Sequence, residues 1–458
     1  MRYESTRGDA PDLGFADVLL AGLAGDGGLY VPTEWPRLPE LGGLGSYADI
    51  AASVMRPFVA DDLDDPTLRS ICHDAYDGFR NPAVTPLVQI DTHHWLLELF
   101  HGPTLAFKDI ALQLVGRLFD HVLDQRGQRV TIVGATSGDT GSAAIDGVVG
   151  CDHVDIVILY PQGRTSEVQR RQMTTVDSPN VHTIAIDGNF DDCQDLVKAM
   201  FGDAAFRDEL RLSAVNSINW ARVMAQIVYY VTASRSLADA PTFCVPTGNF
   251  GNVLSGWIAR EMGAPIADFI VASNENDILT RFINDGDMST RPVVPTLSPS
   301  MDIQVSSNFE RLLFEMNGRD GGLTAEQLGL FRSTGRLTIE PDQRAEFVDG
   351  TFRAARFDDA ATLDEIARVY ADTGIQIDPH TATGTAAARR FCDDRPIVTL
   401  ATAHPAKFPD AVGTATGVHP PLPEHLSDLF ERPERTQTLA NDLATVQAFV
   451  RSVARVVA

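Results

Sequence analysis

Apolar residues are distributed along the chain in two alternating patterns. Short runs rich in β-branched residues predict strands, and segments whose apolar residues recur every three or four positions predict helices. The predicted strands are 129–133, 154–160, 181–186, 241–245, 266–272 and 396–401. The predicted helices are about 142–149, 166–175, 191–202, 253–262 and 405–412, with a long apolar helix near 218–236. This alternation is typical of βαβ units, so we expect an α/β fold around a mainly parallel sheet.

The remaining segments divide the chain further. Residues 1–85 alternate short apolar runs with Gly and Pro clusters and contain helical patterns near 47–60 and 66–78. These features predict a small N-terminal domain. Residues 300–370 carry little strand signal and many acids, so we expect a largely helical insertion there. After about residue 420, a proline-rich turn precedes a predicted terminal helix.

Charge and cysteine content narrow the class of protein. The 458 residues include 62 acidic and 37 basic side chains, and the formal net charge of -25 repels nucleic-acid backbones and anionic membrane surfaces. The five cysteines are scattered without a C-x-x-C pair, and neither a signal-peptide core nor a run of about 20 apolar residues is present. We therefore expect a soluble cytoplasmic protein with no nucleic-acid or membrane partner, which binds any anionic small molecule through a few local groups.

The stretch F-H-G-P-T-L-A-F-K-D at residues 100–109 runs from a Gly-Pro turn into an amphipathic helix. Lys108 lies in the first helical turn, one residue off the apolar stripe. The positive end of the helix dipole disfavours an ammonium group, so this position favours a neutral, nucleophilic amine of the kind that forms a Schiff base. The alternative is an ordinary lysine whose head group reaches solvent.

Two loops between a predicted strand and a predicted helix can bind anions. P-T-G-N-F-G-N at residues 246–252 can turn successive N–H groups inward at a helix N-terminus, which suggests a phosphate site without a Walker or dinucleotide signature. G-A-T-S-G-D-T-G-S at residues 134–142 offers hydroxyl and N–H groups to a carboxylate or phosphate. The alternatives are a plain turn and a capped helix N-terminus, respectively.

Two arginines lie in polar segments of this acidic chain. Arg164 follows a Pro-Gln-Gly turn, and Arg222 lies one helical turn after Asn219. Each can bind an anion or form a structural ion pair.

The last predicted strand ends in A-T-A-H-P-A-K-F at residues 401–408. Thr402 is placed where open α/β sheets bind ligands. We expect His404 and Lys407 to form a helix entry and its solvated first turn. No H-E-x-x-H, Cys/His zinc spacing or G-x-S-x-G motif occurs, so neither a metal site nor a serine hydrolase is indicated.

Taken together, seven motifs resemble those of the threonine synthase family and occur in its order. They are F-H-G-P-T-x-A-F-K-D, G-A-T-S-G-D-T-G, N-S-I-N-W-x-R, P-T-G-N-F-G-N, M-D-I-Q-V-S-S-N-F-E-R, D-P-H-T-A and A-T-A-H-P-A-K-F. The resemblance runs from residue 3 to about residue 412 and includes the N-terminal domain of the longer family members. It implies the tryptophan-synthase β-like fold (fold type II) with two open, mainly parallel α/β lobes. One lobe, about 125–215, would face the substrate, and the other, 86–124 with 216–458, would hold the cofactor pyridoxal 5'-phosphate.

The resemblance also implies residue roles. Lys108 would carry the cofactor as a Schiff base and move protons, and Thr402 would face the pyridine nitrogen. The cofactor phosphate would be held by Gly248, Asn249, Phe250 and Asn252. The substrate would be surrounded by Thr136, Ser137, Thr140, Asn216, Ser217 and Arg222, with Arg164 as a further candidate. His101 and Thr104 are expected beside the Schiff base, and the role of Asp139 stays open.

The implied reaction converts O-phospho-L-homoserine and water to L-threonine and phosphate, the last step of threonine biosynthesis. One alternative is a phospho-amino-acid lyase with the same cofactor that stops at a ketoacid. A non-catalytic relative of the fold is a second alternative. We expect a monomer, as in the longer members of the family.

Overall fold

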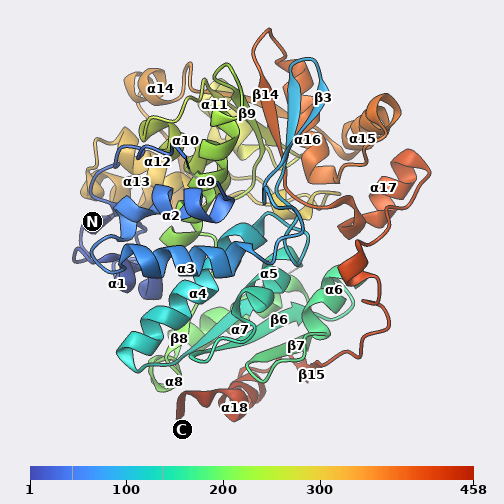
Figure 1. Ribbon diagram of the computed structural model, residues 1–458. Helices are drawn as coiled ribbons and strands as arrows, with labels where there is room; N and C mark the ends of the chain where they lie inside the picture. Colours follow the sequence, from blue (N-terminus) through green and yellow to red (C-terminus); the bar gives the residue numbers. More distant parts are fainter. Residues whose placement is uncertain (44, 137, 458) are drawn as a thin grey trace.

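The computed structural model describes residues 1–43, 45–136 and 138–457. Its strands form two main sheets, which lie in the upper and lower halves of Figure 1. Helices cover both sheets, as the α/β pattern predicts. In the part of the chain that the structure describes, no helix has the length and apolar character that a membrane crossing needs.

The upper sheet has six strands in the order β13-β10-β9-β14-β4-β3. Their bounds are β3 Leu87–Asp91, β4 His94–Glu98, β9 Thr242–Pro246, β10 Phe269–Ser273, β13 Phe352–Arg356 and β14 Ile397–Ala401. All neighbours are parallel except the hairpin β3–β4. Every residue of β9, β10 and β14 is buried, because helices cover both faces of a parallel sheet.

The lower sheet has five parallel strands in the order β15-β7-β6-β5-β8. Their bounds are β5 Val130–Ala135, β6 Val154–Pro161, β7 Val181–Asp187, β8 Leu212–Ser213 and β15 Gln437–Ala440. The helices of this lobe are α5 Asp139–Val148, α6 Glu167–Thr174, α7 Phe190–Gly202, α8 Ala204–Glu209 and α18 Leu443–Val453. The predicted two open, mainly parallel lobes are confirmed.

Two long helices connect the lobes and the N-terminal segment. They are α4 Lys108–Arg126 and α9 Trp220–Arg235, and α9 is buried almost all round, as its apolar sequence predicts. The N-terminal elements β1 Tyr3–Ser5, α1 Phe15–Ala21, β2 Tyr30–Pro32, α2 Tyr47–Val59 and α3 Asp65–Tyr76 pack their apolar side chains into the same core. In Figure 1 these blue elements lie along α4 and α9.

The other helices surround the upper sheet. Their bounds are α10 Gly251–Glu261, α11 Ile278–Asp285, α12 Phe309–Met316, α13 Gly321–Thr334, α14 Pro341–Phe347, α15 Asp359–Thr373, α16 Pro379–Arg390 and α17 Pro409–Thr416. A two-stranded ribbon pairs β11 Met288–Ser289 with β12 Arg336–Leu337, and short 3-10 turns lie at η1 Pro299–Met301, η2 Pro405–Lys407, η3 Glu424–Leu426 and η4 Arg455–Val457.

Two predicted assignments differ from the structure. The insertion 300–370 is not only helical, because β13 forms the edge of the six-stranded sheet. The chain end was expected with that same sheet, but β15 pairs with β7 and α18 packs on the five-stranded sheet instead. Both strands are short edge strands, and an edge strand has a weak apolar signal because it is partly exposed.

Candidate active site

A cavity of about 1070 Å³ lies at the carboxyl ends of strands from both sheets. Its walls include the segments that follow β5, β9 and β14, together with the start of α4. This is the position where open α/β sheets bind ligands. Most of the predicted site residues line it. These are Lys108, Thr136, Thr140, Asn216, Ser217, Arg222, Gly248, Asn249, Phe250, Asn252 and Thr402.

Lys108 is the first residue of α4, and only 7% of its surface is exposed. The surface-lysine alternative is therefore wrong. Burial lowers the pKa of the Lys108 amine; Asp139 opposes this shift, while Lys407 and Arg222 reinforce it. The backbone N–H of Phe107 donates to the Thr402 carbonyl at 2.8 Å, which fixes the start of α4 to the end of β14. A buried amine with a lowered pKa suits nucleophilic attack on an aldehyde.

The loop at residues 246–252 forms a cradle at the N-terminus of α10. Phe250 has a left-handed backbone with φ of 62°, and α10 begins at the next residue. The carbonyls of Gly248 and Asn249 accept hydrogen bonds from the Ser306 hydroxyl and the Asn308 N–H, at 2.7 and 3.1 Å. Because neighbouring groups bind the carbonyls, the loop is free to present its N–H groups to an anion at the positive helix end.

Two further features show that a phosphate group fits this cradle. The Asn252 amide nitrogen is buried and has no hydrogen-bond partner among the described residues, while its Oδ1 accepts from the hydroxyls of Tyr229 and Tyr230. A Cβ at Gly248 would lie 2.7 Å from the Ser300 carbonyl oxygen, so only glycine leaves this space open. A buried unpaired donor beside an open pocket indicates a ligand acceptor.

Arg222 is a second candidate for binding an anion, and its predicted role is at the substrate and not at the cofactor phosphate. Only 4% of its surface is exposed, and burial lowers the pKa of its guanidinium to about 10. Its Nε and Nη1 are buried, and within the described residues no protein acceptor binds them. The structural ion-pair alternative is therefore wrong for Arg222, and an anionic ligand would satisfy it.

Thr136 also has a structural role, and Arg164 is placed differently from the prediction. The Thr136 hydroxyl accepts from the N–H groups of Gly138 and Gly141, both at 3.0 Å, so it shapes the loop at the start of α5. Arg164 is exposed and does not line the cavity. Ser137 lies outside the described residues.

The turn before Lys108 holds the two residues expected beside the Schiff base. His101 binds Glu98, with 2.8 Å between Nε2 and Oε2, and Thr104 binds the carboxylate of Asp109 through both its N–H and its hydroxyl. Neither His101 nor Thr104 lines the cavity. Both residues therefore shape the turn.

Lys407 was expected in a solvated turn, and this expectation is wrong. The residue is fully buried in η2, and its Nζ lies 2.9 Å from Asp139 Oδ1. The helix entry itself is confirmed, since His404 caps η2 by accepting from the Ala406 N–H at 3.1 Å.

His380 is a cavity residue that was not predicted. Its Nδ1 lies 2.6 Å from Asp378 Oδ2, and its Nε2 accepts from the Ser300 N–H at 3.2 Å. The Ser300 hydroxyl in turn lies 3.4 Å from Lys108 Nζ. The motif D-P-H-T-A contains this histidine, but nothing in its local pattern indicates that α16 points it into the cavity.

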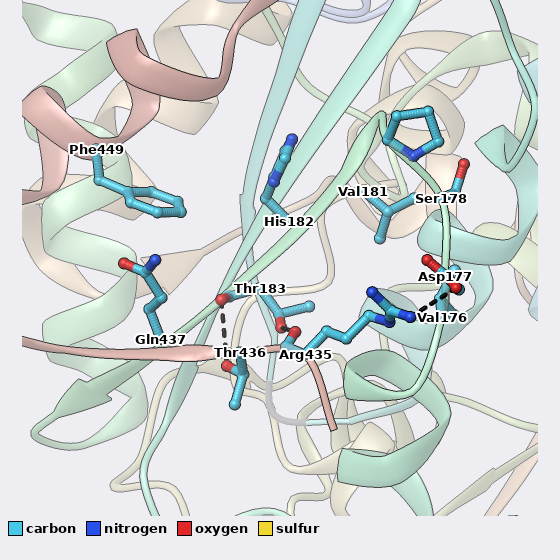
Figure 2. A pocket seen from close by; sticks show the side chains of 11 residues that line it. Val176, Asp177, Ser178, Val181, His182, Thr183, Arg435, Thr436, Gln437 and Phe449 are labelled. Atoms are coloured by element: carbon cyan, nitrogen blue, oxygen red, sulfur yellow. Dashed lines mark hydrogen bonds and ion pairs between the residues drawn. The ribbon is translucent and has the colours of Figure 1, made fainter. Parts of the chain in front are cut away.

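A second hollow, of about 490 Å³, lies between β7, β15 and α18 (Figure 2). Several of its polar groups bind one another. Arg435 pairs with Asp177 at 2.6 Å, and the Thr183 hydroxyl donates to the Arg435 carbonyl at 2.9 Å. These bonds fasten the segment before β15 to β7 and to the loop that precedes β7. None of the predicted site residues that the structure describes lines this hollow.

Comparison with known proteins agrees with the geometry. Three family models match the chain: "Threonine synthase N terminus" at residues 2–76, "Pyridoxal-phosphate dependent enzyme" at 80–328 and "Threonine synthase, C-terminal" at 381–450. The threonine synthase of Pseudomonas aeruginosa is 56% identical over 462 residues, which cover 98% of each chain. The crystal structure of PLP-bound threonine synthase from Brucella melitensis matches with a TM-score of 0.97 and 51% identity, over 99% of this chain and 100% of that one. The yeast threonine synthase structure matches with a TM-score of 0.93 and 38% identity, over 99% and 98% of the two chains.

Proposed function

The chain belongs to the threonine synthase family of pyridoxal-phosphate-dependent lyases, and from this premise we propose that its substrate is O-phospho-L-homoserine. The reaction consumes one water and yields L-threonine and phosphate. The observation that carries the proposal is that one cavity holds a buried amine at Lys108 and two separate groups with unpaired buried donors, Asn252 and Arg222. Two anion sites around one amine match a phosphorylated cofactor and a phosphorylated substrate.

Lys108 would hold pyridoxal phosphate covalently, and residues 248–252 would hold its phosphate. Thr402 would face the pyridine nitrogen, where a hydroxyl does not enforce a protonated ring as an aspartate would. When bound, the cofactor supplies an electron sink that stabilises negative charge at the carbons next to the amino group. The burial of Lys108 and the cradle at the start of α10 support this arrangement.

Arg222, Ser217 and Thr140 would bind the substrate phosphate, and Asn216 and Thr136 would complete the wall around the substrate. The desolvated guanidinium of Arg222 supports this role, because a charge-assisted hydrogen bond is strongest where water is excluded. The same groups would hold phosphate as it leaves Cγ and stabilise its charge.

Lys108 would also move the protons. Once substrate has displaced it from the cofactor, its free amine would take a proton from Cα and then one from Cβ, and phosphate would leave from Cγ. The amine would return one proton to Cγ, water would add its hydroxyl at Cβ, and Cα would regain a proton. The lowered pKa of the Lys108 amine supports its action as a base.

Product analysis tests this proposal. Purified protein with pyridoxal phosphate and O-phospho-L-homoserine is expected to release L-threonine and inorganic phosphate in equal amounts. The Lys108→Ala variant is the matched control and is expected to release neither. If 2-oxobutyrate were the main product, the enzyme would be a lyase that does not add water. A protein with no visible cofactor absorbance would be a non-catalytic relative.

We further propose a monomeric, cytoplasmic enzyme. All five cysteines are free, which supports a reducing compartment. Light scattering coupled to gel filtration tests the monomer; a mass near twice the 49.7 kDa of one chain would exclude it.

A further inference from the structure

The cavity wall contains a second buried lysine. The chain has only three lysines, Lys108, Lys198 and Lys407, so arginine supplies almost all of its 37 basic groups. Two of the three are buried side by side around Asp139. Arginine cannot replace a compact ammonium with three donors in a closed site. The position of Lys407 therefore calls for a role that depends on lysine.

Lys407 is held as an ammonium by three acceptors. Its Nζ donates to the Thr104 carbonyl at 2.7 Å and to Gln172 Oε1 at 3.0 Å, and it lies 2.9 Å from Asp139 Oδ1. These three acceptors match the three N–H donors of the head group. Lys407 is thus fully satisfied within the protein and is not available as a nucleophile.

The two oxygens of Asp139 face different partners. Oδ1 binds Lys407 and also accepts from the Gln169 amide at 2.8 Å. Oδ2 lies 3.4 Å from Lys108 Nζ. Asp139 is the first residue of α5, where the positive end of the helix dipole also favours a carboxylate. Because Oδ1 is fixed by two donors, the direction of Oδ2 is fixed as well.

One carboxylate, Asp139, and two cations, Lys407 and Arg222, act on the charge of Lys108. Burial would raise the pKa of the Asp139 carboxyl, but the charges of Lys407 and Lys108 hold it well below its usual range. Asp139 is therefore ionised, and Lys407 balances its charge. Arg222 on α9 also lowers the pKa of Lys108 through its charge, and His380 on α16 lies in the same cavity wall. Without Lys407, the buried carboxylate would hold Lys108 as its counter-ion.

We propose that Lys407 is a positioning residue for the reaction: by binding Asp139 Oδ1 it directs Oδ2 toward Lys108 Nζ and cancels the carboxylate charge. Lys108 is then fixed in position, but the carboxylate does not keep its amine protonated. Both Schiff-base formation and proton removal require the unprotonated amine. This inference rests on the proposed function, since it takes Lys108 as the residue that carries the cofactor.

The absorbance of the bound cofactor tests the proposal. The pH midpoint of the visible band of protein-bound pyridoxal phosphate reports the charge around Lys108 Nζ. Lys407→Met removes a positive charge and is expected to raise this midpoint by about one pH unit. Asp139→Asn removes the negative charge and is expected to lower it by a similar amount. The double variant, which loses both charges, is expected to titrate close to the wild type.

A matched control separates this effect from the loss of any buried ion pair. Arg7 and Glu310 form a pair at 3.0 Å whose side chains are each 10% exposed, and neither residue lines the cavity. Arg7→Met is expected to leave the midpoint unchanged. Equal shifts in Arg7→Met and Lys407→Met would overturn the proposal. If Lys407→Met does not fold, Asp139→Asn and the double variant still test the proposal. The double variant must reverse the shift in midpoint that Asp139→Asn causes.

Borohydride trapping gives an independent readout. Reduction of the bound cofactor, followed by peptide mass analysis, is expected to label Lys108 and not Lys407. Label on Lys407 would overturn its assignment as a fixed ammonium. If no variant shows visible absorbance, the proposed function fails; if all variants bind the cofactor and titrate at one pH, only this inference fails.

Discussion

Gly116 in α4 packs directly against Gly147 in α5, and there is no room for a side chain between them. A Cβ at Gly116 would overlap the Gly147 carbonyl, and a Cβ at Gly147 would lie 2.5 Å from the Leu112 carbonyl oxygen. The helix that begins with Lys108 and the helix that begins with Asp139 therefore touch backbone to backbone. This close approach sets the spacing between the amine and the carboxylate.

We expect Gly116→Ala to destabilise the protein by about 1–3 kcal/mol, because the added methyl group forces two backbones apart. Urea unfolding measures this change. Gly329 is the matched control, since it also lies inside a helix, α13, and no atom lies within 4 Å of its added Cβ. Gly329→Ala is expected to stabilise by about 0.5–1 kcal/mol, the usual gain from helix propensity. Equal effects of the two substitutions would contradict the close packing of α4 and α5.

Lys108→Arg is expected to abolish the visible absorbance of added pyridoxal phosphate and to reduce threonine formation on the order of 10³-fold or more. A guanidinium has a similar reach to the lysine amine, but it stays charged and is not a nucleophile at neutral pH. Spectroscopy and product analysis measure the two effects, and urea unfolding shows whether the variant keeps its fold. A folded variant that retained wild-type turnover would exclude Lys108 from the chemistry.

The sequence indicates Lys108 and the phosphate loop because their signals are local. A helix start, a run of Gly and Asn and the end of a strand can each be recognised within ten residues. The burial of Lys407 cannot be predicted in this way, because its acceptors on Thr104, Asp139 and Gln172 come from three distant segments. The same reason explains why the prediction for Arg164 fails. Its polar loop has suitable residues for an anion site, but Arg164 is exposed to solvent. Which polar residues face the cavity is decided by the packing of the two lobes.

The buried carboxyl group of Asp109 leads us to expect that the free energy of unfolding depends on pH. Burial raises the pKa of its carboxyl to about 7, although hydrogen bonds from Thr104 oppose the shift. Between about pH 4 and pH 7 the folded chain keeps a proton that the unfolded chain has released, so raising the pH through this window lowers the free energy of unfolding.

Asp109→Asn removes this titration. The free energy of unfolding of the variant, relative to the wild type, is expected to rise by about 4 kcal/mol between pH 4 and pH 7. Urea unfolding at several pH values measures the difference, with the exposed Asp372→Asn as control. A difference between variant and wild type that stays constant over this range would show that Asp109 does not titrate there.

Arg222 and Arg311 are both buried arginines, but they differ in their partners. Arg311 donates to the carbonyls of Tyr30 and Ile218, at 3.0 and 2.7 Å, and to Asn308 Oδ1 at 2.5 Å. Arg222 Nε and Nη1 have no such acceptor among the described residues. Removing a satisfied buried cation leaves its acceptors unpaired, whereas removing an unsatisfied one relieves a desolvation cost.

We therefore expect opposite effects on the ligand-free protein. Arg311→Met should lower the free energy of unfolding by about 3–5 kcal/mol, and Arg222→Met should raise it by about 1–3 kcal/mol. Arg222→Met should also raise KM for O-phospho-L-homoserine by about 10- to 100-fold, because a charge-assisted hydrogen bond to the phosphate is lost. Inorganic phosphate, added during urea unfolding, should stabilise the wild type more than the variant, because the variant keeps only the cradle at residues 248–252. A variant that is less stable than the wild type without ligand would mean that Arg222 holds the fold and not the substrate.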